Sequence, residues 1–158
     1  MSAGSVDNGR LPVAMGGCQC GAVRYALYVP PQKPHVCHCR MCQRATGGLF
    51  AALAGAPKHD FAWTRGAPGV FASSNQATRP YCRDCGTPLG FAYHSADARQ
   101  YVTIGSLDEP ARVPIVEQYG IESRIPWVSF CEQVPAEATG ADPADAPFLA
   151  ALTSHQDR

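Results

Sequence analysis

The sequence predicts a mainly β protein of short strands joined by turns, and three observations lead to this fold class. Glycine (15 residues) and proline (14 residues) are plentiful and are spread along all 158 residues, which favours many turns. No stretch spaces its apolar residues as a helix would for more than about two turns. Residues 22–29 instead alternate as a strand does, because every second side chain of a strand faces the same way.

The expected elements follow from these patterns in chain order. Proline residues end the strand at 22–29, residues 35–39 are extended, and residues 40–45 form one or two helical turns that Gly47-Gly48 stops. The further strands that we expect are 49–54, a pair at 61–64 and 70–73 joined by the turn 66–69, one on each side of residues 82–85, and 101–104, 115–119 and 127–130.

Composition and charge argue against several classes of protein. Thirteen Lys and Arg residues balance thirteen Asp and Glu residues, so the net charge is zero, whereas a general nucleic-acid binder is usually basic. No run approaches 18 apolar residues, so no transmembrane helix is expected. The N-terminus lacks a basic segment followed by an apolar one, so no signal peptide is expected either. We therefore predict a cytoplasmic protein whose partners are neither nucleic acid nor membrane.

The domain organisation that we expect is simple. A flexible leader covers residues 1–12, one domain covers 13–134, and an irregular tail covers 135–158. Within the tail, Phe148, Leu149 and Leu152 predict a short helix that packs back on the body.

Seven of the eight cysteines fall into three tight clusters. The clusters are Cys18-Gln-Cys20, Cys37-His-Cys39-Arg-Met-Cys42 and Cys82-Arg-Asp-Cys85. In a reducing compartment, clustered thiols are more often metal ligands than disulfides. The Cys-x-Cys spacing also suits a disulfide poorly, because residues two apart on a strand point the same way but lie too far apart. We therefore favour metal binding over disulfides.

Two of the clusters pair naturally into one closed zinc site. Cys18 and Cys20 form one two-sulfur turn, Cys82 and Cys85 form another, and strands flank both. Four thiolates saturate a structural zinc ion, which then contributes folding energy. The alternative is that Cys82 and Cys85 form a redox-active dithiol, but such a pair usually precedes a helix, and here Gly86, Thr87 and Pro88 follow.

The middle cluster has three cysteines and leaves one coordination position open. Zinc held by Cys37, Cys39 and Cys42 would be a weak Lewis acid for water and better suited to binding another thiol. The expected substrate is therefore a sulfur compound. Arg40 and Arg44 lie in the same segment, and either could bind carboxylates of that substrate or be solvated charge.

Histidines near the triplet leave an alternative open. His38 lies between two of the cysteines and could be a fourth ligand or a base, although the two-residue repeat of a strand favours the opposite face. His35 has the same position with a weaker case. If His38 closes the second site, all seven cysteines serve structural metals.

Three segments of the sequence resemble those of a known family. They are Gly17-Cys-Gln-Cys-Gly-Ala-Val-Arg-Tyr25, Cys37-His-Cys-Arg-Met-Cys-Gln-Arg-Ala-Thr-Gly47 and Arg79-Pro-Tyr-Cys-Arg-Asp-Cys-Gly-Thr-Pro-Leu89, and the segments 104–108 and 123–127 fit as well. The chain resembles the glutathione-dependent formaldehyde-activating family, which includes the domain of centromere protein V. The similarity runs from about Gly16 to about Trp127.

The resemblance implies a β-tent fold of antiparallel sheets, stapled by a structural zinc on Cys18, Cys20, Cys82 and Cys85. It also implies a second, catalytic zinc on Cys37, Cys39 and Cys42. The reaction attributed to the family joins glutathione to formaldehyde and gives S-hydroxymethylglutathione, as a carbon–sulfur lyase working in reverse. Zinc, two per chain, and glutathione are thus the expected cofactor and co-substrate.

Two function classes therefore remain in view. The first is a zinc enzyme acting on a thiol and a small aldehyde, and the second is a non-catalytic zinc module that uses the fold as an interaction surface. Tyr119 and Trp127 either line the pocket or pack in the core. Cys131 stands apart from the clusters and is expected to be a small buried apolar residue.

Overall fold

The computed structural model describes residues 9–94, 99–127, 143 and 146–151 of the chain. Cys131, Leu152 and the predicted strand residues 128–130 lie outside the described residues. The strands are β1 (Ala14–Gly17), β2 (Arg24–Leu27), β3 (Gln32–Cys37), β4 (Ala51–Pro57), β5 (Phe61–Arg65), β6 (Gly69–Ala72), β7 (Ala77–Tyr81), β8 (Gly90–Tyr93), β9 (Arg99–Thr103) and β10 (Glu117–Tyr119). The α-helices are α1 (Arg40–Thr46) and α2 (Ala146–Ala151), and short 3-10 helices cover Lys58–Asp60, Ile104–Ser106, Pro110–Arg112 and Ile121–Ser123.

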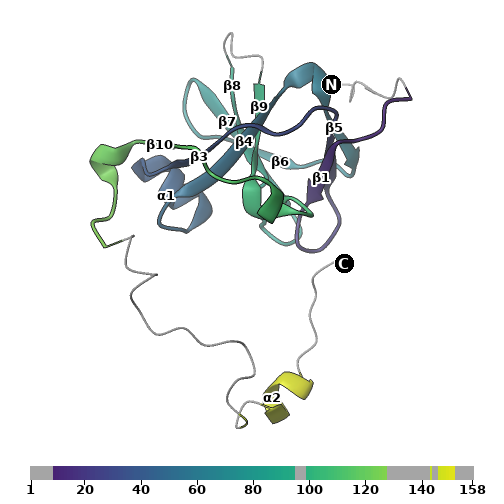
Figure 1. Cartoon of the computed structure of the whole chain (residues 1–158), viewed down its shortest axis with the longest axis vertical. Helices are drawn as coiled ribbons and strands as arrows, with labels where there is room; N and C mark the ends of the chain where they lie inside the picture. Colours follow the sequence, from purple (N-terminus) through teal and green to yellow (C-terminus); the bar gives the residue numbers. More distant parts are fainter. Residues whose placement is uncertain (1–8, 95–98, 128–142, 144–145, 152–158) are drawn as a thin grey trace.

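Two sheets form the body of the protein, and the predicted mainly β, antiparallel fold class is confirmed. A three-stranded sheet has the order β1-β2-β5, and a seven-stranded sheet has the order β10-β3-β4-β9-β8-β7-β6. In Figure 1, α1 and β10 lie at one side of the body, whereas β1 and β5 lie at the other. One pair departs from the antiparallel rule, since β10 runs parallel to β3.

One predicted pairing is wrong. The strands expected at 61–64 and 70–73 both exist, but β5 pairs with β2 and β6 pairs with β7. The turn between them therefore leads the chain from one sheet into the other. Gly66 in this turn has a φ of 62°, and an added Cβ there would collide with the carbonyl oxygen of Ala22, close to the start of β2. This tight contact holds the end of β5 against β2, which turn residues alone could not indicate.

The main hydrophobic core draws on both sheets and includes two of the cysteines. Tyr25 and Leu27 from β2 belong to the same core cluster as Leu89, which precedes β8, and Val102 from β9. All four residues are fully buried. Cys18 and Cys82 belong to the same buried cluster. The turns that carry the outer cysteine pairs are therefore anchored in the core of the fold.

The backbone around the predicted helical turns matches the sequence closely. Cys39 caps the start of α1, where its side chain accepts a hydrogen bond from the Cys42 N–H. Gly47 ends the helix in the left-handed region with a φ of 66°, as a C-terminal glycine commonly does. The short helix α2 is present in the tail, and its exposed residues include Ala146 and Pro147.

Gly90 sets the close approach of β8 and β9. An added Cβ at Gly90 would meet the carbonyl oxygen of Tyr101 well inside van der Waals contact. Because that oxygen belongs to backbone, it cannot move away as a flexible side chain would.

We therefore expect Gly90→Ala to lower the free energy of unfolding by about 1–3 kcal/mol. The matched control is Gly105→Ala, because nothing lies within 4 Å of the Cβ position there. Its effect should stay within about 0.5 kcal/mol. Urea unfolding followed by circular dichroism measures both, and equal losses in the two variants would contradict this account of the β8–β9 contact.

Candidate metal centres

The first candidate metal centre joins two turns that are far apart in sequence. The sulfur atoms of Cys18, Cys20, Cys82 and Cys85 all lie within 4.8 Å of one another. Cys18 and Cys82 are buried, whereas Cys20 and Cys85 are exposed at the surface. The sequence-predicted grouping of these four residues is thus what the structure brings together.

Each turn of this four-cysteine cluster is shaped by a glycine. Gly21 has a φ of 75° and its N–H donates to the Cys18 carbonyl, while Gly86 has a φ of 76° and its N–H donates to the Cys82 carbonyl. The Val23 N–H points at Cys18 Sγ over 3.2 Å. In each turn, a glycine in the left-handed region therefore lets the backbone direct its sulfur atoms and N–H groups toward one point.

The second candidate centre is the triplet of Cys37, Cys39 and Cys42. Its three sulfur atoms also lie within 4.8 Å of one another. Cys37 ends β3, Cys39 caps α1 and Cys42 lies in the helix, so a strand-to-helix turn builds the site. The His38 N–H donates to the Tyr119 carbonyl over 2.8 Å and ties this turn to β10.

The sulfur spacing of the four-cysteine group fits a tetrahedral zinc ion. A Zn–S bond of about 2.3 Å places neighbouring ligand sulfurs about 3.8 Å apart. The observed Sγ–Sγ distances are 3.5 Å for Cys18 to Cys20 and 3.8 Å for Cys20 to Cys82. The chain therefore has two cysteine clusters that could hold a metal ion, one with four sulfurs and one with three.

The local electrostatics of the thiols are uneven. Burial raises the pKa of Cys37 to about 12. At Cys39 burial acts in the same direction, but hydrogen bonds from the Cys42 and Met41 backbone outweigh it and lower the pKa. Burial also opposes ionisation of Cys85, yet the Thr87 hydroxyl and N–H lower its pKa to about 6. Each cluster thus holds one thiol with a lowered pKa, Cys39 in the triplet and Cys85 in the four-cysteine group.

Arg79 brings a positive charge directly to the triplet. The side chain is 8% exposed, and its Nη2 donates to Cys42 Sγ over 3.5 Å. Its Nε donates to the Ser73 hydroxyl over 3.0 Å, and its guanidinium lies 5.0 Å from the centre of the Phe91 ring. A buried guanidinium with these partners is fixed in place and can offset the negative charge of thiolates.

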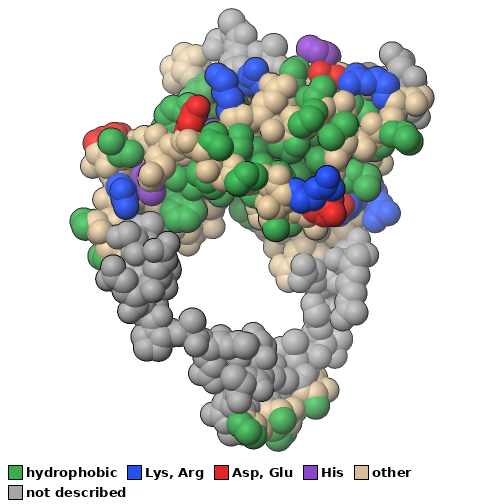
Figure 2. Space-filling model, in the orientation of Figure 1, with side chains coloured by type: hydrophobic (Ala, Val, Ile, Leu, Met, Phe, Trp, Pro, Cys, Tyr) green, Lys and Arg blue, Asp and Glu red, His purple; other side chains and the backbone are tan. Residues whose placement is uncertain are grey.

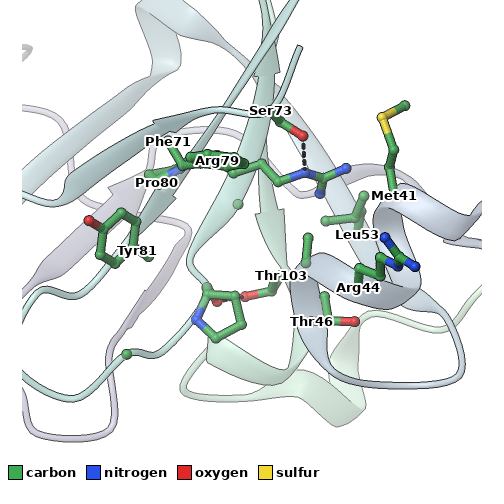
Figure 3. A pocket seen from close by; sticks show the side chains of 14 residues that line it. Met41, Arg44, Thr46, Leu53, Phe71, Ser73, Arg79, Pro80, Tyr81 and Thr103 are labelled. Carbon is green, nitrogen blue, oxygen red and sulfur yellow. Dashed lines mark hydrogen bonds between the residues drawn. The ribbon is translucent and has the colours of Figure 1, made fainter.

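Two cavities meet at Arg79. One, of about 320 Å³, is lined by all three cysteines of the triplet. The other, of about 400 Å³, is lined by Arg44. Figure 3 shows this second cavity, with Arg44 and Met41 projecting from α1 and Arg79 reaching across from β7 toward them. The residues common to both cavities are Met41, Leu53, Ser73 and Arg79.

Only some of the other residues predicted for the site line the triplet cavity. His35 and Tyr119 line the triplet cavity, whereas Arg40 and Trp127 are not among its lining residues. Arg40 bonds to Gln43 on its own helix, and Trp127 is 54% exposed, so it is not a core residue. Arg44 lines the neighbouring cavity.

The two histidines near the triplet have different surroundings. His38 is 1% exposed, its Nε2 lies 3.1 Å from the Gln118 side-chain oxygen, and it is not part of either sulfur group. His35 Nδ1 lies 2.8 Å from the Lys33 carbonyl, which can only accept. Nδ1 of His35 therefore donates this hydrogen bond.

Sequence reasoning missed Arg79 and the rings of Phe91 and Tyr101, which all line the triplet cavity. Arg79 stood inside a segment already singled out, two residues from Tyr81 and three from Cys82. A charged residue within a strand that leads into a buried cysteine turn is a signal that could have identified it.

The surface gives less information. In Figure 2, basic and acidic side chains are interspersed among apolar ones, so the described residues on this face form no continuous basic patch. Among the described residues, no helix has the length and apolar character needed to cross a membrane.

Comparison with known proteins now identifies the family. The family model for the glutathione-dependent formaldehyde-activating enzyme matches residues 13–121. The chain belongs to this family, as its cysteine motifs led us to expect.

Two individual proteins are also similar to this chain. An uncharacterized lyase of Schizosaccharomyces pombe (strain 972 / ATCC 24843) is 32% identical over 83 residues, which are 52% of this chain and 60% of that relative's length. A crystal structure of a Rhodobacter sphaeroides protein has a TM-score of 0.54 and 26% identity, and the match covers 66% of this chain and 98% of that one.

Arg79→Lys should weaken metal binding at the triplet by about 10–100-fold, because lysine keeps the charge but loses the fork that holds Cys42 and Ser73 together. Competition with a chelator, followed by counting zinc per chain, measures this. The four-cysteine cluster should keep its metal, which shows that the fold is intact.

Arg112→Lys is the matched control, because Arg112 pairs only with Glu109 at the exposed surface in the described part of the chain. Equal metal loss from Arg79→Lys and Arg112→Lys would contradict a role of Arg79 at the triplet.

Proposed function

We propose that this protein is a zinc-dependent enzyme of the carbon–sulfur lyase type. It would join a thiol such as glutathione to a small aldehyde such as formaldehyde, and would run the reverse reaction equally. The thiol sulfur forms a bond to the carbonyl carbon, the C=O double bond becomes a single bond, and the thiol proton ends on the oxygen.

One observation carries the proposal: among the described residues the cavity-lining triplet offers only three sulfur ligands, whereas the other group, of which Cys18 and Cys85 also line a cavity, offers all four. Cys18, Cys20, Cys82 and Cys85 would hold a structural zinc, and Cys37, Cys39 and Cys42 a catalytic one. At the triplet, a bound zinc would supply a soft Lewis acid that favours the thiolate form of an incoming thiol. Membership of the family and the lyase name of the yeast relative support this class of reaction.

The protein's own residues have clear parts in this proposal. Arg79 offsets the charge of the thiolates and fixes Cys42. Ser73 accepts from Arg79, so its own O–H is left to donate to the oxygen on which charge develops. The aromatic lining of the cavity offers an apolar surface beside the reacting atoms.

Carboxylate recognition falls to the neighbouring cavity. We predicted Arg40 and Arg44 for the carboxylates of glutathione, and of the two Arg44 lines a cavity that shares Arg79 with the triplet cavity. A peptide thiol can thus place its sulfur at the triplet while its carboxylate reaches Arg44. A cytoplasmic location, where glutathione is the abundant thiol, fits this substrate.

Cys42→Ala should reduce bound zinc from two ions to one per chain and abolish glutathione binding, while the domain stays folded. Cys82→Ala should instead unfold the domain, because a structural zinc site is part of the folding free energy. Metal analysis, calorimetric titration with glutathione and circular dichroism measure these outcomes.

Unfolding of Cys42→Ala would give the triplet a structural role. A wild-type protein that holds two zinc ions yet gives no heat with glutathione would favour the alternative function, a non-catalytic zinc module.

Arg44→Gln should raise the KM for glutathione by about tenfold with little change in kcat, because a carboxylate contact made equally in substrate and transition state affects binding. Arg40→Gln is the matched control from the same helix, and it should raise KM less. A larger KM change in Arg40→Gln would reverse the assignment of the carboxylate contact between these two arginines.

A further inference from the structure

We propose that the aldehyde used at this site carries a planar apolar group, such as an aromatic ring, and that formaldehyde is a poorer substrate. This inference rests on the proposed function and narrows its substrate class. Three features of the triplet cavity lead to it: a continuous series of aromatic rings, the size of the cavity, and the positions of the two nearby arginines.

Five aromatic rings line the triplet cavity, and each ring contacts the next in a series. The centroid distances are 4.9 Å from Tyr119 to His35, 5.6 Å from His35 to Tyr101, 6.1 Å from Tyr101 to Phe91 and 4.6 Å from Phe91 to Tyr93. We call these residues the aromatic arc. They come from β10, β3, β9 and β8, so the arc crosses most of the seven-stranded sheet.

The arc is not simply part of the hydrophobic core. Tyr93 is 44% exposed and Tyr119 is 47% exposed, and neither Phe91 nor Tyr101 is fully buried. All five residues line the same cavity as the three cysteines. Aromatic side chains that face a cavity beside a reactive group offer a surface for another flat apolar group.

The size of the cavity points the same way. Its volume of about 320 Å³ lies in the range of sites for small organic ligands. A water molecule takes about 30 Å³ in the liquid, and formaldehyde, with two heavy atoms, is of the same order. Formaldehyde alone would leave most of the cavity unfilled, and its contact with the arc would be slight.

The proposed position of the thiol sulfur indicates which half of the adduct meets the arc. The reacting thiol sulfur lies at the triplet, and the carbonyl carbon must be within bonding distance of it, so the aldehyde's substituent projects from that point into the triplet cavity. The polar chain of glutathione instead has Arg44 in the neighbouring cavity. Arg79, which lies over the Phe91 ring, lines both cavities.

The reaction balances without another reactant. The thiol sulfur adds to the carbonyl carbon of the aromatic aldehyde, the C=O bond becomes a C–O single bond, and the thiol proton moves to that oxygen. Nothing is oxidised or reduced, and the product is the hemithioacetal of glutathione and the aldehyde.

The experiment compares benzaldehyde with formaldehyde, each with glutathione, on the zinc-loaded full chain. For each aldehyde, kcat/KM for adduct formation is divided by the uncatalysed rate constant, which removes the difference in intrinsic reactivity. We expect this acceleration to be at least about tenfold greater for benzaldehyde, which corresponds to the binding of one aromatic ring against another.

Variants of the arc test whether its rings cause the preference. Phe91→Leu, which keeps apolar volume, and Tyr119→Ala, which changes an exposed side chain, should each lower the benzaldehyde-to-formaldehyde ratio by about three- to tenfold. Tyr28→Ala is the matched control, because Tyr28 follows β2 in the other sheet and its ring faces Arg10. Two zinc ions per chain in every variant confirm folding.

The outcomes separate this inference from the proposed function. Acceleration of both aldehydes with formaldehyde equal or preferred would overturn the aromatic preference and leave the proposed function standing. A preference for benzaldehyde that the arc variants leave unchanged would also overturn the inference. If neither aldehyde is accelerated, the proposed function fails, and the aldehyde assignment fails with it.

Discussion

The convergence of Cys18 and Cys20 with Cys82 and Cys85 is the constraint on which the rest of the structure depends. It joins turns separated by 62 residues in sequence, measured from Cys20 to Cys82. Cys18 and Cys82 are part of the same buried cluster as Leu89 and Val102, so this junction is continuous with the core of both sheets. Strand β8, which follows the second turn, carries Phe91, and Phe91 pairs with Tyr101 of β9. Fixing this turn therefore also fixes part of the triplet cavity.

The triplet depends on a different kind of support. Its cysteines come from one strand-to-helix turn, so their spacing is local, but their environment is not. Arg79 reaches Cys42 from β7, and the Tyr119 carbonyl holds the backbone of His38 from β10. Gln43 adds a further link, because its side-chain amide donates to both the His38 and Ser123 carbonyls. A local sulfur cluster is thus held by three distant segments of the chain.

The two cavities differ in the side chains that line them. The sulfur atoms and the aromatic arc occupy one cavity, Arg44 lines the other, and Arg79 belongs to both. A peptide thiol carries charged groups, whereas the proposed aldehyde is flat and apolar. The cavity with Arg44 suits the charged groups, and the cavity with the aromatic arc suits the apolar one. The Arg79 guanidinium contacts the sulfur of Cys42, the hydroxyl of Ser73 and the ring of Phe91.

The sequence by itself determined the features that local chemistry controls. Cysteine spacing indicated the three cysteine clusters, Gly47 indicated the end of α1, and strand alternation indicated β2, because each depends on residues within a few positions. That two of the clusters share one metal followed from the four ligands that a structural zinc needs. Tertiary structure alone decided that β5 pairs with β2 and not with β6, that β10 runs parallel to β3, and that Arg79 and the aromatic arc surround the triplet. These features depend on contacts between segments tens of residues apart, and such contacts are set by how the sheets close around the shared core, which no short pattern in the chain encodes.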